Sequence, residues 1–223
     1  MRKTTSLLVG CLLSTTVLTA THSWADDLET YKITITNLTP GQPFAPILAA
    51  SHHSDMSFFT VGQAPNDELA MLAEAGNGNP MATKLRGMPG VSDVRVSTTG
   101  LTLPGKSTTL MISARRGWDR VSIGAMLGAT NDAFFAVTDV ALPKGRQIAT
   151  YIAEAYDAGS ETNDELCATV PGCGGAAAAY SPDDHGEGFV HIHNGIHGIG
   201  DLSAAKMDWR NPTAQVVIER VAR

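Results

Sequence analysis

Short stretches of alternating apolar and polar residues constrain the fold of this chain most. The first, at 31–37, places Tyr31, Ile33 and Ile35 on one face and threonines on the other, which is the period of a half-buried strand. Further apolar runs follow at spacings of roughly 8–15 residues, with Gly, Pro and Asn between them. The chain lacks the strand–helix–strand rhythm of a parallel sheet, so it is predicted to be all-β, an antiparallel β-sandwich.

The same pattern indicates where the elements lie. Two short helices are expected, one at 66–76, which opens at the cap candidate Asn66 and ends at Gly76, and one at 80–86. We interpret them as helical insertions between strands. The strands are predicted at 31–37, 44–50, 56–61, 91–96, 108–114, 120–127, 133–137, 147–155, 189–193 and 214–221.

The first 25 residues resemble a secretory signal peptide. Two basic residues precede an apolar segment, and small residues lead to Ala25, after which we expect cleavage. The apolar segment is too short and too rich in Ser and Thr for a membrane span, which needs roughly 20 apolar residues. Leu-Val-Gly-Cys ending at Cys11 also fits a lipoprotein cleavage box, but that cut would leave too short an apolar region before it. We therefore expect one domain at 26–223 that is secreted or periplasmic, with no transmembrane segment in the mature chain.

Charge narrows the classes of partner. Residues 1–25 carry two bases and no acid, so their removal takes the formal charge from −6 to −8 over the 198 residues that remain. Nucleic acids and anionic membranes are bound through clustered Lys and Arg, and the chain has no such cluster. We therefore expect no nucleic-acid partner, and the partner we do expect is an unidentified extracellular or surface protein or glycan.

Two cysteines, Cys167 and Cys173, follow the predicted signal peptide. An even pair in an exported chain predicts a disulfide that closes a small loop. The alternative is a redox or metal-binding thiol pair. The five intervening residues do not match the two-residue spacing of those motifs.

An acidic turn at 154–165 holds five carboxylates around Gly159. Crowded carboxylates repel one another, and oxygen-rich side chains around a flexible Gly can surround a Ca²⁺ ion. A solvated surface turn is the alternative interpretation. Asp132 stands at the entrance of another apolar strand, where Asp also serves ordinary turn chemistry. Because loops cluster at the ends of a sandwich, Asp132 and the acidic turn are expected to meet at one end.

Three separated segments resemble the N-terminal domain of the spondin family. Residues 130–137, Thr-Asn-Asp-Ala-Phe-Phe-Ala-Val, look like the family's SPDW stretch and the hydrophobic strand after it. Residues 156–161 are similar to its WDAGTD segment, and 214–223 to its closing ARVVIERIAR strand. With the strand at 31–37 at its start, the resemblance spans about residues 29–223. It implies a C2-like antiparallel β-sandwich in which loop carboxylates hold a calcium ion.

Matched position by position, the resemblance implies Asp132, Asp157 and Glu161 as the calcium ligands. Glu161 stands where the family has Asp, and Ala133 and Tyr156 stand where it has Trp. Backbone carbonyls and waters would complete the shell, since Ca²⁺ takes six to eight oxygens. Relatives in extracellular matrix and adhesion proteins imply a role in interactions at or outside the cell surface.

A histidine cluster offers a second metal chemistry. His191 and His193 would share one face of a strand, and the glycine-rich continuation could fold His197 toward them. Three imidazoles suit Zn²⁺ or Cu²⁺. The alternative is a strand with ordinary polar residues. In this alternative Glu187 is the candidate general base beside a metal-bound water, which would make the chain a metal-dependent hydrolase.

The sequence thus favours an exported, calcium-binding, non-catalytic spondin-like module. A periplasmic transition-metal protein or metal-dependent enzyme built on His191, His193 and His197 is the second hypothesis. No HExxH motif, nucleophile elbow or phosphate-binding loop occurs in the chain, so no catalytic residue is assigned.

Overall fold

The computed structural model describes residues 28–54, 56–173 and 180–221. The predicted signal peptide with its cleavage point at Ala25, and Cys11, lie outside the described residues. The strands are β1 Leu28–Asn37, β2 Leu48–His52, β3 Val91–Val96, β4 Ser107–Arg115, β5 Arg120–Met126, β6 Ala133–Ala141, β7 Ile148–Asp157, β8 His191–Ile192 and β9 Ala214–Arg220. The helices are α1 Asp67–Ala75, α2 Asn79–Arg86, α3 Ala204–Met207 and a 3₁₀ turn at Pro171–Cys173.

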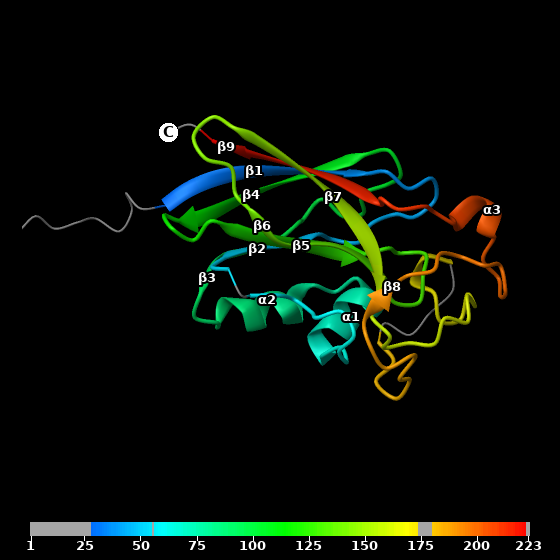
Figure 1. The fold of residues 1–223 in the computed structure, drawn as a ribbon. Coiled ribbons are helices and arrows are strands. Elements are labelled where there is room, and N and C mark those ends of the chain that lie inside the picture. Colours follow the sequence, from blue (N-terminus) through cyan, green and yellow to red (C-terminus); the bar gives the residue numbers. More distant parts are fainter. Residues whose placement is uncertain (1–27, 55, 174–179, 222–223) are drawn as a thin grey trace, which may run out of the picture.

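The strands form a single antiparallel sheet that folds over itself into two layers, nearly a barrel (Figure 1). Its strand order is β3-β2-β5-β6-β7-β9-β1-β4, and β8 adds to β7. The prediction of an all-β antiparallel sandwich is therefore confirmed. Strands β1 and β9, which are the first and last strands of the sheet in sequence, pair with each other and lie in the same layer.

Strand β7 belongs to both layers. Its first part pairs with β9, in register from Ile148 opposite Glu219 to Ala153 opposite Ala214. Its last part pairs with β6, where Asp157 lies opposite Ala133. A strand that changes partners along its length makes a corner between two packed layers. The end of β7 is consequently held by strands on both sides.

Side chains connect the two layers at the opposite edge, between β3 and β4. Asp93 accepts a hydrogen bond from the Ser113 backbone N–H at 2.9 Å, and Ser92 accepts one from the Arg115 N–H at 3.0 Å. The Ser51 hydroxyl donates to the Ser113 carbonyl at 2.6 Å. These bonds satisfy backbone groups that an open edge would leave exposed.

Alternating residues of the two layers fill the main core. Tyr31, Ile33 and Ile35, predicted to share the buried face of the first strand, are 4%, 0% and 0% exposed. Phe44 and Phe135 meet in this core with ring centroids 4.5 Å apart. Burial of such side chains is the dominant favourable contribution to folding.

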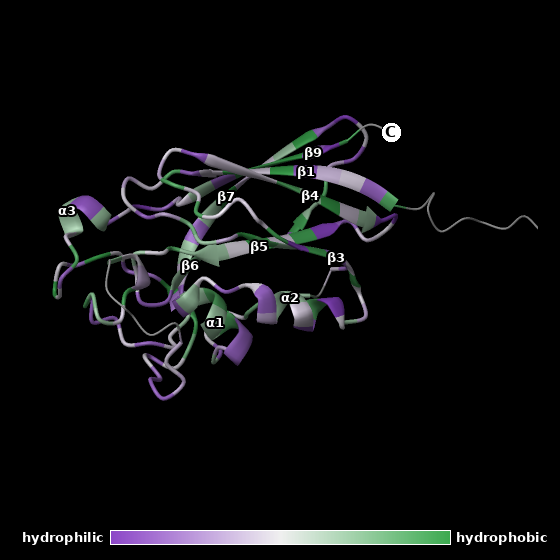
Figure 2. Ribbon diagram, turned by 180° about the vertical axis from the view of Figure 1, so that it is seen from behind, coloured by the Kyte–Doolittle hydropathy of each residue, from purple (hydrophilic) through white to green (hydrophobic). Residues whose placement is uncertain are grey.

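Helices α1 and α2 cover the outer face of the layer that contains β2 and β5 (Figure 1). Both helices were predicted, and α1 has the expected caps: the Asn66 side chain accepts from Leu69 N–H, and Gly76 is left-handed. Figure 2 shows mixed polar and apolar positions along both helices, as expected when one face is buried. Leu72 and Leu85 pack from these helices into a second apolar cluster.

Three strand predictions require correction. Residues 56–61 form an irregular segment, because Met56 and Phe58 are buried against the helices and the outer sheet face instead of pairing. The strand expected at 44–50 begins only at Leu48, since Phe44 makes isolated bridges. The strand expected at 189–193 shortens to β8. An apolar run can cover a sheet as well as extend one, and periodicity does not separate the two.

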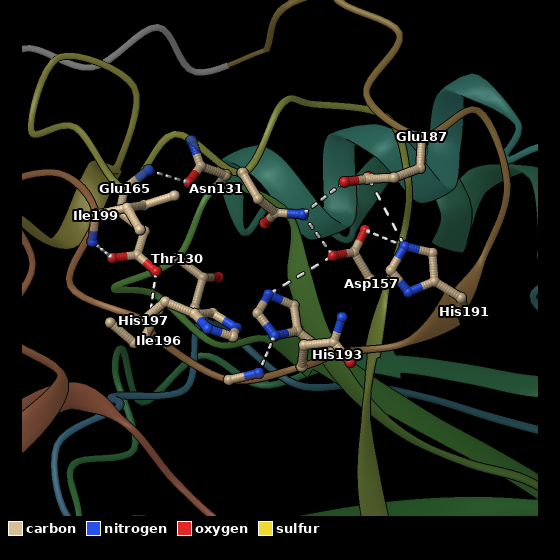
Figure 3. A pocket seen from close by; sticks show the side chains of 13 residues that line it. Thr130, Asn131, Asp157, Glu165, Glu187, His191, His193, Ile196, His197 and Ile199 are labelled. Carbon is tan, nitrogen blue, oxygen red and sulfur yellow. Dashed lines mark hydrogen bonds and ion pairs between the residues drawn. The ribbon is translucent and has the colours of Figure 1, made fainter.

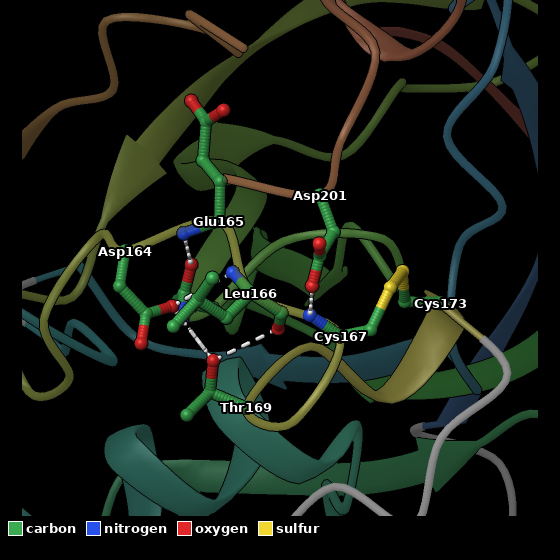
Figure 4. The surroundings of a disulfide bond; sticks show 8 residues. Asp164, Glu165, Leu166, Cys167, Thr169, Cys173 and Asp201 are labelled. Atoms are coloured by element: carbon green, nitrogen blue, oxygen red, sulfur yellow. Dashed lines mark hydrogen bonds between the residues drawn. A yellow bond between two sulfur atoms is a disulfide. The ribbon is translucent and has the colours of Figure 1, made fainter. Parts of the chain in front are cut away.

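Cys167 and Cys173 form the predicted disulfide, in the loop that follows the acidic turn (Figure 4). Asp201 accepts a hydrogen bond from the Cys167 backbone N–H at 2.9 Å and ties this loop to the segment before α3. A disulfide is consistent with an exported protein. Within the part of the chain that the structure describes, no helix is long and apolar enough to cross a membrane.

Candidate metal centre

The turn before β6 and the acidic turn after β7 lie side by side, as the sequence predicts. Asp132 accepts hydrogen bonds through Oδ2 from the backbone N–H groups of Ser160, at 2.8 Å, and Glu161, at 3.1 Å. In return, Ala158 N–H donates to the Asp132 carbonyl at 3.2 Å. These bonds fix the start of the acidic turn against β6.

Asp132 is fully buried, and its Oδ1 has no hydrogen-bond partner within the described residues. Burial raises the pKa of Asp132 well above its ordinary value, and the neighbouring charge of Asp157 raises it further. Asp132 supports the turn through its hydrogen bonds to the backbone N–H groups of Ser160 and Glu161.

Asp157 is the last residue of β7 and is 1% exposed. Its Oδ1 accepts from Gly159 N–H at 2.7 Å, and its Oδ2 accepts from the Asn163 amide at 2.8 Å. Gly159 has φ +66°, and a Cβ there would lie 2.3 Å from the Phe189 carbonyl oxygen. The glycine thus allows the segment that begins at Phe189 to lie directly against the turn.

Strand β8 brings His191 to Asp157. The two residues are directly opposite in the β7–β8 pairing, and cross-strand neighbours share a face of the sheet. His191 Nε2 lies 3.7 Å from Asp157 Oδ1 and 3.8 Å from Glu187 Oε2 (Figure 3). One ligand atom from each of the three side chains lies within 4.8 Å of the others. This partly buried Asp–Glu–His group can hold a metal ion.

The hydrogen bond of His191 leaves Nε2, the ring nitrogen nearest the two carboxylates, free to bind a metal. Its Nδ1 lies 3.0 Å from the Ile192 carbonyl oxygen, which only accepts, so the proton of the neutral ring is on Nδ1. The lone pair of Nε2 then faces two carboxylate oxygens. Metal-bound histidines commonly donate their other N–H to a backbone carbonyl in this way.

His193 has the opposite arrangement. Its Nδ1 accepts a hydrogen bond from Gly195 N–H at 2.9 Å, so the proton of the neutral ring is on Nε2. That Nε2 lies 3.6 Å from Asp157 Oδ2 and has no hydrogen-bond partner within the described residues. Burial lowers the pKa of His193, so the neutral ring is favoured. An N–H directed at Asp157 orients that carboxylate and is not a metal ligand.

The remaining predicted ligands lie apart from the Asp–Glu–His group. His197 lines the same pocket but is outside the group. Glu161 accepts from the Ser181 hydroxyl at 2.9 Å, and its carboxylate is close enough to Glu74 to be repelled. Burial, then the charges of neighbouring acids, raise the pKa of Glu161 to about 7. Within the described residues, the three carboxylates expected for calcium do not converge as one set.

A pocket of about 170 Å³ opens beside the group. It is lined by Asp157, Glu187 and His191 together with His193, His197, Thr130, Asn131, Asn163, Glu165, Asn194, Gly195, Ile196 and Ile199 (Figure 3). A metal held by three protein ligands at such a position has room for further ligands from the pocket.

From the sequence, Glu187 was predicted only as a candidate general base and not as a metal ligand. The one sequence feature that could have linked Glu187 to the site is its spacing of four residues from His191. Such a spacing brings two side chains together on a helix, but residues 185–188 form neither a helix nor a strand. The positive φ of Gly186 and Gly188, +44° and +78°, turns the chain so that they meet.

Comparison with known proteins adds no assignment. No protein-family model matches the chain, and no curated protein matches it. The interpretation of the site therefore depends on its own geometry.

Proposed function

We propose that this protein is an exported metal-binding protein whose centre consists of Asp157, Glu187 and His191. The observation that carries the proposal is the position of the His191 Nε2 lone pair, 3.7 and 3.8 Å from two carboxylate oxygens. Three acceptors that face one another repel unless a cation lies between them. A Zn²⁺ ion with ligand distances of about 2.0–2.2 Å needs ligand atoms at about this separation.

The donor set favours a first-row transition ion, with Zn²⁺ as the leading candidate. One imidazole nitrogen and two carboxylates suit Zn²⁺, whereas Ca²⁺ prefers an all-oxygen shell of six to eight ligands. Calcium bound by Asp132, Asp157 and Glu161, and the spondin resemblance that implies it, remain predictions. The same titrations with Ca²⁺ test them.

The first prediction concerns metal affinity. Isothermal titration of the metal-free protein with Zn²⁺ is expected to show one site, and His191→Gln and Glu187→Gln to weaken it by about 100-fold or more. Loss of a direct ligand should exceed the 10- to 100-fold effect of outer-shell partners. Both side chains are partly exposed, at 21% and 39%, so these variants should fold.

His185→Gln is the matched control, because His185 lies in the same loop as Glu187 and is outside the Asp–Glu–His group. It should bind Zn²⁺ like the unmodified protein. If all three variants bind Zn²⁺ like the unmodified protein, the proposal is wrong. Elemental analysis of natively purified protein identifies the bound ion.

A further inference from the structure

One side chain of the acidic turn contacts both carboxylates of the Asp–Glu–His group. The amide nitrogen of Asn163 donates to Asp157 Oδ2 at 2.8 Å and to Glu187 Oε1 at 3.2 Å. A side-chain amide carries two N–H groups, and an ionised carboxylate only accepts, so each proton of the amide goes to one of the two ligands. All three side chains line the same pocket.

These two hydrogen bonds divide the oxygens of each carboxylate. The oxygens held by Asn163 are Asp157 Oδ2 and Glu187 Oε1. The oxygens that face His191 Nε2 are the other two, Asp157 Oδ1 at 3.7 Å and Glu187 Oε2 at 3.8 Å (Figure 3). Each carboxylate is therefore arranged to bind a metal through one oxygen only.

The orientation of Glu187 depends on Asn163 more than that of Asp157 does. The Asp157 carboxylate is 1% exposed and also accepts from Gly159 N–H at 2.7 Å. The Glu187 side chain is 39% exposed and extends from a loop without helix or strand. An exposed side chain on a loop keeps its rotamer freedom unless a hydrogen bond restricts it. The bond from Asn163 provides that restriction.

The loop that carries Glu187 is attached to the acidic turn by other bonds as well. Asp184 accepts from the Thr162 hydroxyl at 2.9 Å and from the Thr162 backbone N–H at 3.1 Å. The backbone of the loop is thus held without Asn163. Loss of the Asn163 amide should free the two carboxylates and leave the loop in place.

The number of oxygens that each carboxylate offers decides which metal fits. Zn²⁺ takes four ligands at short distances, and three protein atoms leave it one open position. Ca²⁺ takes six to eight oxygens and often uses both oxygens of a carboxylate. To offer both oxygens, Asp157 and Glu187 would have to give up their bonds from Asn163.

We propose that Asn163 is a positioning residue that keeps Asp157 and Glu187 as one-oxygen ligands and thereby sets the preference of the centre for Zn²⁺ over Ca²⁺. This inference rests on the proposed metal site, because Asn163 acts only through the two carboxylates. The atom of Asn163 that faces them is a donor nitrogen, which offers no lone pair to a metal.

The test compares the Zn²⁺ and Ca²⁺ affinities of each variant by isothermal titration. Asn163→Leu keeps the approximate size of the side chain and removes both N–H donors. It should weaken Zn²⁺ binding about 10- to 100-fold, as loss of an outer-shell partner does, and leave Ca²⁺ binding unchanged or stronger. The ratio of the two affinities should therefore fall at least about tenfold. Asn163→Gln retains the amide and should recover part of the ratio.

Co²⁺ in place of Zn²⁺ reports the coordination number, because four-coordinate Co²⁺ absorbs visible light more strongly than six-coordinate Co²⁺. The unmodified protein should give the strong band. Asn163→Leu should weaken it, since the freed carboxylates can bind through both oxygens. Asn194→Leu is the matched control, because Asn194 is exposed and lines the same pocket. It should match the unmodified protein in affinity ratio and absorption.

The two proposals fail separately. If the unmodified protein binds no Zn²⁺, the metal site is wrong and this inference with it. If Zn²⁺ binds and Asn163→Leu keeps both the affinity ratio and the Co²⁺ band, only the role of Asn163 is overturned. The same conclusion follows if Asn163→Leu weakens both metals equally with an unchanged band, or if Asn163→Gln is no better than Asn163→Leu.

Discussion

At the scale of single residues, Asp157 connects the turn to the candidate centre. One oxygen accepts from Gly159 and the other from Asn163, at 2.7 and 2.8 Å, while His191 and His193 approach the same carboxylate from two sides. The sequence identified Asp157 through the acidic turn. Glu187 and His191 reach this carboxylate through a loop and a short strand, and the three side chains form a group that could hold a metal ion.

A residue-scale prediction concerns Glu161, which is 2% exposed and whose pKa is raised to about 7. The folded protein binds this proton more tightly than the unfolded chain, whose Glu has the ordinary value of 4.5. The free energy of unfolding should therefore fall as pH rises from about 4.5 to 7. Below this window the stabilisation is complete, and above it the charged carboxylate carries its full penalty.

Glu161→Gln should remove this pH dependence and be more stable than the unmodified protein above pH 7. The pKa rises from 4.5 to about 7, and at about 1.4 kcal/mol per pKa unit the gain is on the order of 3–4 kcal/mol. Gln retains an acceptor for the Ser181 hydroxyl. Urea unfolding at several pH values checks the result, with exposed Glu154→Gln as the control. An unchanged pH slope in Glu161→Gln would contradict the assignment.

At the scale of elements, the loop after β7 depends on cross-links. The disulfide between Cys167 and Cys173 has a sequence separation of 6, and Asn131 accepts from Glu165 N–H at 3.2 Å just before it. The disulfide and this hydrogen bond hold in place the segment from which Glu165 lines the pocket. The loop has few hydrogen bonds of regular secondary structure, so such tethers define its course.

The element-scale prediction is that removing the disulfide lowers stability by about 2 kcal/mol, as loop-closure entropy gives for so short a loop. Cys167→Ser with Cys173→Ser should show the loss in urea unfolding. Adding a reductant should lower the stability of the unmodified protein and leave the double variant unchanged. A double variant as stable as the unmodified protein would show that the other tethers suffice.

At the scale of the whole molecule, β7 joins the two layers by pairing with β9 along its first part and β6 along its last. Neither layer can separate without breaking a strand that both share. The described residues therefore form one cooperative unit.

The whole-molecule prediction is a single unfolding transition. Tryptophan fluorescence, which includes Trp209 near α3, and far-ultraviolet circular dichroism should give the same midpoint in urea. Trp209 is 5% exposed and packs on His193 with ring centroids 5.0 Å apart, so it reports on tertiary structure beside the centre. Two separated midpoints would indicate layers that unfold independently.

Local sequence rules predicted much of this architecture. The alternation at Tyr31, Ile33 and Ile35, the caps Asn66 and Gly76 and the cysteine pair are recognisable because each depends on near neighbours in the chain. The strand expected at 56–61 was wrong, since apolar composition indicates burial but does not specify a pairing partner.

The sequence by itself determined an all-β fold with two small helices, a disulfide, and the acidic and histidine-rich segments that supply the candidate ligands. Only the tertiary structure decided which of them meet. Pairing of β8 with β7 sets His191 opposite Asp157, the glycines around Glu187 bring it to the same point, and Ser181 holds Glu161 elsewhere. A site is a set of distances between side chains, and those distances depend on strand pairing and loop course that no local pattern encodes.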